Sequence, residues 1–239
     1  MNILTIDTST DIELISVTTD GKTFEFAENV KMSHSVTMFD SLDRVLKEAK
    51  INLKDINLVG VGVGPGSFTG VRIAVSTARM ISQILNIPLA GLTSQDIYAA
   101  SADPEPGEKI LAAFDAKKSR VFAALYISRG MFPPETLINA GDYSIESILD
   151  KVSPVDRLLC IGDGCGRYAG IIDEKSRLIG FSYRFIDNFI PRGDAAARLT
   201  SIKYSESPQK FSFYGNTVPF YARKSDAEIA KEEKDKKNT

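Results

Sequence analysis

Short runs of alternating apolar and polar residues fill the start of the chain, a pattern typical of β-strands. Residues 2–7 form an apolar run that ends at an aspartate, and residues 13–28 continue the alternation on both sides of Asp20 and Gly21. An Asp-Gly pair between two such runs is a strong signal for a two-residue hairpin turn. We therefore predict three consecutive strands, the first paired with the second.

The spacing of apolar residues then changes to three or four, which indicates a helix over residues 35–50. Its apolar positions are Val36, Phe39, Leu42, Val45, Leu46 and Ala49. Residues 56–64 are typical of a buried strand, and residues 69–86 predict a second helix between Pro65 and Pro88. A further short strand is expected over residues 88–93.

The second half of the chain also alternates between strand and helix patterns. Residues 103–109 contain two prolines and a glycine and are interpreted as a linker. Residues 110–128 predict a strand, a turn and a strand. A helix over 143–152, a strand over 157–164 and a helix over 190–203 follow. This alternation predicts the α/β class, with helices covering the sheets, and no internal repeat is evident in the sequence.

Composition and charge add few constraints. The chain has 239 residues, of which 43% are apolar and 25% charged, as in ordinary globular proteins. The net charge of −2 gives no general attraction to nucleic acid or to an anionic membrane. The sequence lacks a run of about eighteen apolar residues, the length that spans a membrane.

The expected compartment is the cytoplasm. Asp7 interrupts the first apolar run, so the N-terminus does not resemble a signal peptide. The two cysteines, Cys160 and Cys165, are then expected to be reduced thiols. Two thiols alone cannot complete a structural zinc site, which needs four ligands.

The stretch GVGVGPGSFTGVRI, residues 60–73, raises the question of a phosphate-binding loop. Gly70 is followed by Val71 and Arg72, so the lysine of a P-loop is absent, and Thr69 stands where a dinucleotide-binding fingerprint has its third glycine. A serine or threonine here can cap the following helix, whose free N–H groups could bind an anion. We favour a sharp strand-to-helix corner formed by Gly64, Gly66, Ser67, Thr69 and Gly70.

Few residues point to catalysis. His34 is the one histidine of the chain, and Met38 occupies the position four residues later, where a second metal-binding histidine would stand. We therefore reject a histidine-pair metal site. The first strand ends in Asp7, Thr8, Ser9 and Thr10. These groups suit either a phosphate or magnesium site or a turn closed by side-chain hydrogen bonds, and spacing alone does not separate the two.

The second helix is apolar on two sides, whereas a surface helix usually buries one stripe. Ile73, Met80 and Ile84 lie on one side, and Val71, Ala74 and Ile81 lie on another. We predict that the two N-terminal helices pack together and present an apolar surface to a partner. Another part of the same chain could instead cover that surface. The predicted interface consists of Met38, Leu42, Val45, Ile73, Thr77, Met80 and Ile84.

Several stretches resemble the bacterial TsaB family of tRNA threonylcarbamoyladenosine biosynthesis proteins. They are ILTIDTST, the His34-Ser35 helix start, GPGSFTGVRIAVSTAR, LTSQDIYA, DAKKSRVFAALY and PFYARKSDA. The GPGSFTG-x-R motif is shared with the catalytic paralogue TsaD. TsaD-like enzymes carry two metal-binding histidines four residues apart, and this chain matches the first at His34 but departs at Met38. The resemblance therefore implies the noncatalytic partner of TsaD.

The resemblance implies the two-lobed α/β fold of actin-like ATPases, sugar kinases and heat-shock ATPases. We expect a first lobe over residues 1–103, completed by about 212–228, a second lobe over 104–211 and a disordered charged tail over 229–239. In that superfamily the first hairpin loop touches phosphate, so Asp7 to Thr10 would be a vestigial phosphate site. The glycine corner would then begin the interface helix.

The resemblance also implies the partners. The chain would pair with TsaD through the two N-terminal helices, act with the ATPase TsaE, and form a homodimer without them. It would support transfer of threonylcarbamoyl to the adenosine next to the tRNA anticodon, contacting tRNA through the complex. We expect no required cofactor, with ATP or ADP binding at the level of the complex. The alternatives are a small-molecule kinase or ATPase of the same superfamily and, ranked lower, a metallopeptidase.

Overall fold

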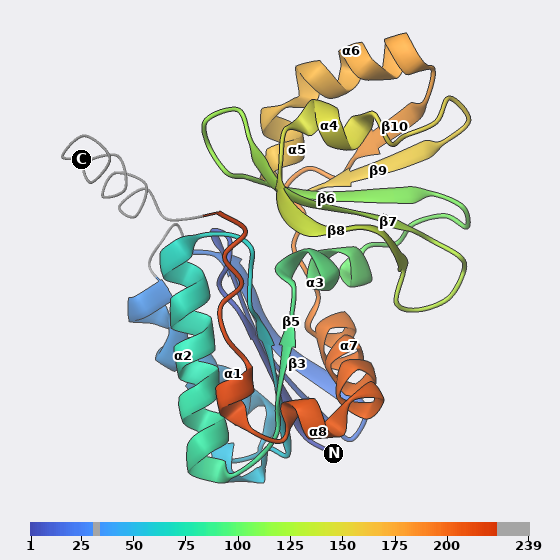
Figure 1. The fold of residues 1–239 in the computed structure, drawn as a ribbon. Coiled ribbons are helices and arrows are strands. Elements are labelled where there is room, and N and C mark those ends of the chain that lie inside the picture. Colours follow the sequence, from blue (N-terminus) through green and yellow to red (C-terminus); the bar gives the residue numbers. More distant parts are fainter. Residues whose placement is uncertain (31–33, 224–239) are drawn as a thin grey trace, which may run out of the picture.

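The computed structural model describes residues 1–30 and 34–223, and this part of the chain forms two lobes, each built on a five-stranded sheet (Figure 1). The first sheet contains β1 (Ile3–Asp7), β2 (Ile12–Thr19), β3 (Lys22–Asn29), β4 (Leu58–Gly62) and β5 (Leu89–Leu92), in the order β3-β2-β1-β4-β5. Strands β1, β2 and β3 are antiparallel neighbours, while β4 and β5 run parallel to β1. The three predicted N-terminal strands are confirmed.

The turn between β2 and β3 has the form that the sequence predicts. Asp20 and Gly21 both have positive φ angles, of 49° and 74°. Such a pair of left-handed residues is the turn whose twist matches that of the two strands it joins. It sets the register in which Thr18 lies opposite Thr23.

Helices cover both faces of the first sheet (Figure 1). On one face, α1 (His34–Ala49) and α2 (Phe68–Leu85) pack their apolar side chains into one core with the strands. On the opposite face lies α7 (Gly193–Glu206), which packs Ala195, Ala196 and Leu199 beneath β2 and β5. Both predicted N-terminal helices are therefore present, within one residue of the expected bounds.

The second sheet repeats the topology of the first. It contains β6 (Lys109–Asp115), β7 (Val121–Ile127), β8 (Glu135–Tyr143), β9 (Arg157–Ile161) and β10 (Ser182–Phe185), in the order β10-β9-β6-β7-β8. Strands β6, β7 and β8 are antiparallel neighbours, β9 is parallel to β6, and β10 is parallel to β9. The two lobes are thus a structural repeat that the sequence alone does not reveal.

Short helices cover one face of the second sheet. They are α4 (Ile145–Leu149), α5 (Asp163–Arg167) and α6 (Ala169–Ile179). The other face is covered by α3 (Ser94–Ser101), which follows β5 of the first lobe and therefore links the two lobes. The remaining elements are the 3-10 turns η1 (Leu53–Asp55) and η2 (Tyr214–Asn216) and the short helix α8 (Pro208–Phe211).

One predicted lobe boundary is wrong. We expected residues 104–211 to form the second lobe, but α7 packs on the first sheet, and its apolar residues share cores with β1, β2, β4 and β5. The chain therefore returns to the first lobe before residue 193. The order of elements along a sequence does not reveal which sheet a late helix will cover. The predicted tail at 229–239 lies outside the described residues.

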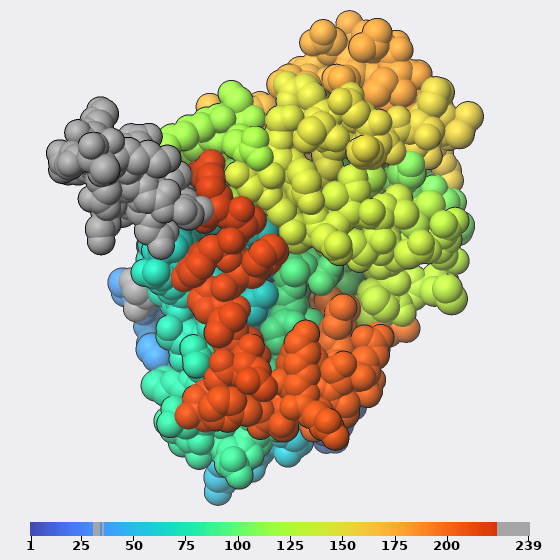
Figure 2. All heavy atoms as spheres, in the orientation of Figure 1, coloured from blue at the N-terminus to red at the C-terminus, as the bar shows by residue number. Residues whose placement is uncertain are grey.

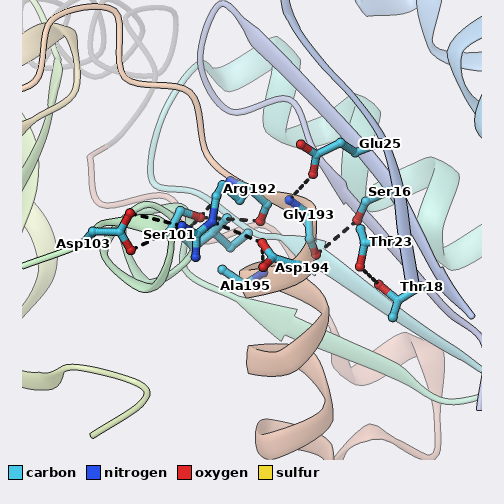
Figure 3. Close-up of polar contacts among 11 residues, drawn as sticks. Ser16, Thr18, Thr23, Glu25, Ser101, Asp103, Arg192, Gly193, Asp194 and Ala195 are labelled. Carbon is cyan, nitrogen blue, oxygen red and sulfur yellow. Dashed lines mark hydrogen bonds and ion pairs between the residues drawn. The ribbon is translucent and has the colours of Figure 1, made fainter. Parts of the chain in front are cut away.

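The two segments that cross between the lobes are joined to each other (Figure 3). At the start of α7, the backbone N–H of Arg192 donates to Ser101 Oγ at 2.9 Å, and its guanidinium contacts the Asp103 carboxylate at 3.2 Å. The backbone N–H of Gly193 donates to Glu25 Oε2 at 2.6 Å. A side chain at Gly193 would meet Ser16 Cβ at 2.3 Å, so this crossing fits closely against the first sheet.

After η2 the chain runs across the surface of the first lobe as an extended strap, residues 217–223, drawn in red in Figure 2. Thr217 Oγ1 donates to the Leu89 carbonyl at 2.9 Å, and the Phe220 N–H donates to the Val63 carbonyl at 2.8 Å. These bonds attach the chain end, as far as it is described, to β5 and to the end of β4 in the first lobe. Among the described residues no helix has the length and apolar character to cross a membrane.

Candidate partner interface and interlobe cleft

The glycine corner and the turn after β1 are packed against each other. The Ser67 N–H donates to the Ser9 carbonyl at 2.6 Å, and Thr8 Oγ1 donates to the Gly70 carbonyl at 2.7 Å. A Cβ atom at Gly66 would lie 2.3 Å from the Ser9 carbonyl oxygen, and one at Gly70 only 1.8 Å from that of Thr8. The glycines therefore permit close packing between the backbone of the corner and that of residues 8–9. A phosphate has no room between these two segments.

Ser67 is the residue that caps α2. Its hydroxyl oxygen accepts the Gly70 N–H at 3.3 Å, and its carbonyl accepts the Val71 N–H at 2.9 Å. Gly64 has a φ of +90°, which a residue with a side chain rarely adopts, and this lets the chain turn from β4 toward the helix. Thr69, the other predicted capping candidate, lies within the first turn of the helix.

Asp7 is directed into the protein. Its Oδ1 accepts the Ser9 N–H at 2.8 Å, which closes the turn expected for such a residue. A side chain at Gly62 would meet the Asp7 carboxyl carbon at 2.4 Å. Burial raises the pKa of this carboxyl, although the hydrogen bond from the Ser9 N–H opposes the shift. Of the four predicted phosphate-site residues, Asp7, Thr8 and Ser9 are buried and Thr10 alone lines the interlobe cleft.

His34 is a buried structural residue. Its Nδ1 lies 3.2 Å from Glu13 Oε2 and its Nε2 lies 2.8 Å from the Thr10 carbonyl. Both partners are acceptors, so the protonated ring satisfies both. Burial lowers the pKa of His34, but the hydrogen bond to Glu13 and the one to Thr10 outweigh it, and the net shift is upward.

Glu13 is the polar residue that the sequence analysis missed. It lies in β2, is fully buried, and accepts hydrogen bonds from Thr37 at 2.8 Å and from Ser41 at 2.7 Å in addition to the contact with His34. Burial raises its pKa, but these three partners outweigh that effect and the net shift is downward. A charged residue at an inward position of a strand, with a lone histidine downstream, is the signal that could have revealed this pair.

The interlobe cleft has a volume of about 580 Å³. The first lobe contributes Thr10 and Asp11, the linking helix α3 contributes Tyr98, and the second lobe contributes Asp163, Asp187 and the aromatic residues Phe185 and Phe189. No lysine or arginine stands among the described residues that line it. Burial and the nearby carboxylates of Asp115 and Asp11 raise the pKa of Asp163. The cleft is therefore acidic and repels a phosphate group that has no bound cation.

The described part of the chain offers no ready metal centre. No group of three or more histidine, cysteine, aspartate or glutamate side chains is arranged there to hold an ion. The thiols of Cys160 and Cys165 are both buried near the floor of the cleft and form no disulfide.

Part of the predicted interface is not on the surface. Met38, Leu42 and Val45 point toward the sheet and lie in the core of the first lobe, and Thr77 is also buried. Ile73 is partly buried against the same core. The helical spacing identified residues that share a side of α1, but it did not reveal that this side faces the sheet.

The outer surfaces of both helices nevertheless expose large apolar side chains. Met80 and Ile84 near the end of α2 are 43% and 72% exposed, and Val36 and Phe39 near the start of α1 are 76% and 56% exposed. We call these four residues the helix face. Because both helices run antiparallel to β4, the two pairs lie at opposite ends of the helix layer, and only a partner that extends along both helices covers all four residues. Met80 and Ile84 are therefore the members of the predicted interface that remain available to a partner.

The fold and this geometry define the class: a two-lobed α/β protein in which the strand order of one lobe is repeated in the other. Residues 27–236 match the family model described as TsaD, tRNA N6-adenosine threonylcarbamoyltransferase. Among curated proteins, the chain is 34% identical over 169 residues to the tRNA threonylcarbamoyladenosine biosynthesis protein TsaB of Buchnera aphidicola subsp. Schizaphis graminum, covering 68% of this chain and 78% of that protein.

Further similarities agree with this. TsaB of Bacillus subtilis is 28% identical over 186 residues, covering 76% of this chain and 79% of that protein. A Pseudomonas aeruginosa protein described as similar to the peptidase YeaZ superposes with a TM-score of 0.77 at 21% identity, over 93% of this chain and 99% of that one, which shows the fold. The chain belongs to the TsaB (YeaZ-like) family.

Proposed function

We propose that this protein is a noncatalytic scaffold subunit in the synthesis of threonylcarbamoyladenosine on tRNA. It pairs with TsaD through the helix face and holds TsaD in an active form, and together with the ATPase TsaE the complex transfers threonylcarbamoyl to the adenosine next to the anticodon. The curated relatives carry the name of this pathway, which supports the pathway itself. In the absence of TsaD, the same face joins two copies of this chain.

The observation that carries the proposal is the exposed helix face. Burying an apolar side chain gains roughly 1.5–3 kcal/mol relative to leaving it in water. Covering Val36, Phe39, Met80 and Ile84 with a complementary helix pair therefore gives a favourable association, whereas their exposure in a lone chain brings no gain. Such a surface suits a subunit whose task is to hold a partner.

The environment of His34 supports a role other than metal chemistry. To bind a metal, His34 would have to give up its contact with Glu13 or with the Thr10 carbonyl, and giving up Glu13 would leave that buried carboxylate without its cationic partner. The metallopeptidase alternative needs that ligand, so it ranks lowest.

The kinase or ATPase alternative rests on the interlobe cleft. The volume of the cleft suits a small ligand. Its described lining contains three aspartates and no lysine or arginine, so it opposes the binding of a triphosphate that carries no metal ion. ATP or ADP is accordingly assigned to the complex and not to this chain. Calorimetric titration of the isolated chain with ATP and Mg²⁺ tests the alternative directly, because tight binding with phosphate release would establish it.

Introducing one charged side chain into the helix face tests the proposal. Ile84→Asp is expected to abolish association with the TsaD of the same organism and to reduce tRNA modification by the reconstituted complex at least about tenfold, since an unpaired buried charge costs several kcal/mol. Complex mass is measured by light scattering and modification by mass spectrometry of tRNA nucleosides.

Leu178→Asp is the matched control, because Leu178 is 76% exposed on α6 of the second lobe. It should leave both association and modification unchanged. An Ile84→Asp protein that still forms the full complex would overturn the interface assignment, and TsaD that modifies tRNA at full rate without this chain would overturn the scaffold role.

A further inference from the structure

A second exposed surface lies where the start of α2 meets the strap, and it differs in chemistry from the helix face. The Arg72 guanidinium carbon is 3.8 Å from the centre of the Phe68 ring and 5.6 Å from that of Tyr221. Arg72 Nε donates to the Tyr221 hydroxyl at 2.8 Å, and the two rings lie 4.8 Å apart. Two aromatic rings and one hydrogen bond therefore hold the arginine in a fixed orientation.

Arg72 is held in place without being neutralised. It is exposed, and among the described residues it has no carboxylate within ion-pair distance. Arg44 on α1 provides the contrast: it lies 5.7 Å from the Phe26 ring, but Glu48 at 3.0 Å and Glu28 at 3.9 Å balance its charge. The terminal nitrogens of Arg72 are thus available to an anion from outside the chain.

The strap extends this surface with exposed rings and more positive charge. Phe220 and Tyr221 are 39% and 42% exposed. The strap reaches Arg223, which donates to the Ala116 carbonyl at 3.0 Å and so meets the tip of the β6–β7 hairpin. Figure 2 shows the upper end of the red strap against that green loop of the second lobe. We call Phe68, Arg72, Phe220, Tyr221 and Arg223 the arginine–aromatic face.

The charge of this region contrasts with that of the whole chain. Arg72 and Arg223 belong to the face, and on the adjoining hairpin Lys117 is paired with Asp115. The complete sequence has a net charge of −2. A local excess of positive charge beside exposed aromatic planes is suited to a partner that is both anionic and aromatic.

We propose that the arginine–aromatic face binds unpaired nucleotides of an RNA loop. Bases of a single-stranded loop stack on tyrosine, phenylalanine and arginine planes, and the phosphates pair with arginine. Here Tyr221 and Phe220 supply the stacking planes, and the terminal nitrogens of Arg72 receive a phosphate. Identifying the RNA as the anticodon loop of tRNA rests on the proposed function. A purely apolar protein partner would leave the positive charge unmatched, which favours the nucleic acid.

The test is fluorescence anisotropy with a labelled tRNA anticodon stem–loop, measured for the full chain alone and again with TsaD. Arg72→Ala and Tyr221→Ala are each expected to weaken binding about tenfold, and Arg72→Ala to reduce the salt dependence by about one phosphate contact. Tyr221→Phe keeps the ring and should weaken binding less than about threefold.

Arg198→Ala is the matched control, because Arg198 lies 4.1 Å from the Phe132 ring but stands on α7, on the other side of the first sheet. It should bind RNA as the unmodified chain does. Thermal unfolding of each variant separates loss of binding from loss of folding.

Three results would overturn the proposal: unchanged RNA affinity in Arg72→Ala and Tyr221→Ala, an equal loss in Arg198→Ala, or a loss of TsaD association in place of RNA binding. The outcome is independent of the scaffold role. Ile84→Asp tests only the scaffold role. The RNA-binding measurement on the full chain by itself requires no TsaD. A preference for an unrelated RNA loop would keep the binding site but remove its assignment to the anticodon.

Discussion

The two lobes have the same five-strand topology, and the difference between them lies at the corners where a parallel strand turns into a helix. In the first lobe, the β4–α2 corner is filled by the turn after β1, because Gly66 and Gly70 lie against the Ser9 and Thr8 carbonyls. In the second lobe, the β9–α5 corner also packs closely on the neighbouring strand, because a Cβ at Gly162 would lie 2.3 Å from the Ala113 carbonyl oxygen, but this corner borders the cleft, where Gly162 and Asp163 form part of the lining.

The helices that follow the two corners differ in length and in N-terminal capping. The closed corner leads into an 18-residue helix capped by Ser67, whereas the cleft-side corner leads into the five-residue α5, whose N-cap, Gly162, forms no side-chain cap. One topology therefore yields a rigid helix with an exposed outer face in one lobe and a short cleft wall in the other.

The largest expected effect comes from adding one methyl group to the closed corner. Gly70→Ala places a Cβ atom where the Thr8 carbonyl lies, at 1.8 Å, so the backbone must move, and we expect a loss of about 3 kcal/mol or more in the free energy of unfolding. Urea denaturation provides the measurement.

Gly166→Ala is the same substitution in the second lobe. Its Cβ would have no neighbour within 4 Å, so the helical preference of alanine should leave the protein unchanged or more stable by up to about 1 kcal/mol. Equal losses for Gly70→Ala and Gly166→Ala would show that the close contact of Gly70 with the Thr8 carbonyl does not cause the loss.

An ion pair in each lobe, buried in the first and partly exposed in the second, gives the next comparison. His34→Ala removes the partner of the fully buried Glu13 and is expected to cost about 3 kcal/mol. Adding Glu13→Gln to that variant should recover part of the loss, because it removes the unpaired charge. Thermal and urea unfolding of the single and double variants measure the coupling. A cost under about 0.5 kcal/mol, the range of surface substitutions, would refute the structural role of His34.

The corresponding pair in the second lobe is weaker because water reaches it. Arg184 contacts both carboxylate oxygens of Glu108 at 2.8 Å, but the arginine side chain is nearly half exposed. Arg184→Ala is expected to cost about 1 kcal/mol, well below His34→Ala, since an exposed partner is replaced by solvent. Urea unfolding of the two variants side by side tests this ranking, which a larger loss in Arg184→Ala would reverse.

The pH dependence of the His34–Glu13 pair has a defined sign. The raised pKa of His34 adds stability that is complete below its ordinary value of 6.5 and is lost as the pH rises through the folded pKa above it. The lowered pKa of Glu13 adds stability that is present above its ordinary 4.5 and is lost as the pH falls through the folded pKa below it.

The stability difference between the unmodified chain and His34→Ala should therefore be greatest between about pH 4.5 and 6.5. It should shrink on either side of that window. Urea titrations at several pH values check this, and a difference that grows steadily toward alkaline pH would contradict it.

The first lobe was largely predictable from sequence because its elements are strongly periodic and bounded by clear turn residues such as Asp20, Gly21 and Pro88. The second lobe was less so. Strand β8 lies at an edge and buries none of its residues fully, so burial imposes no clean alternation on it. Helix α6 and strand β10 also escaped prediction, and each has mostly exposed or partly exposed positions.

The candidate site was predictable only in outline. The sequence located α1 and α2, but periodicity does not reveal which side of a helix meets a sheet, so Met38 and Leu42 were assigned to the surface instead of Val36 and Phe39. The arginine–aromatic face depends on Arg72 and Tyr221, which lie 149 residues apart, and no local pattern connects them.

The two segments that cross between the lobes are tied together where Ser101 and Asp103 bind Arg192, and this contact has a mechanical consequence. Because the two connecting segments are tied together at one place, the lobes can swing apart by backbone rotation near residues 102–108 and 187–192 while both sheets stay intact. Widening the cleft in this way would also break the hydrogen bond from Arg223 to the Ala116 carbonyl, by which the strap joins the two lobes. A partner seated on the first lobe alone would leave that swing free, whereas one that spans α2, the strap and the β6–β7 hairpin would lock it.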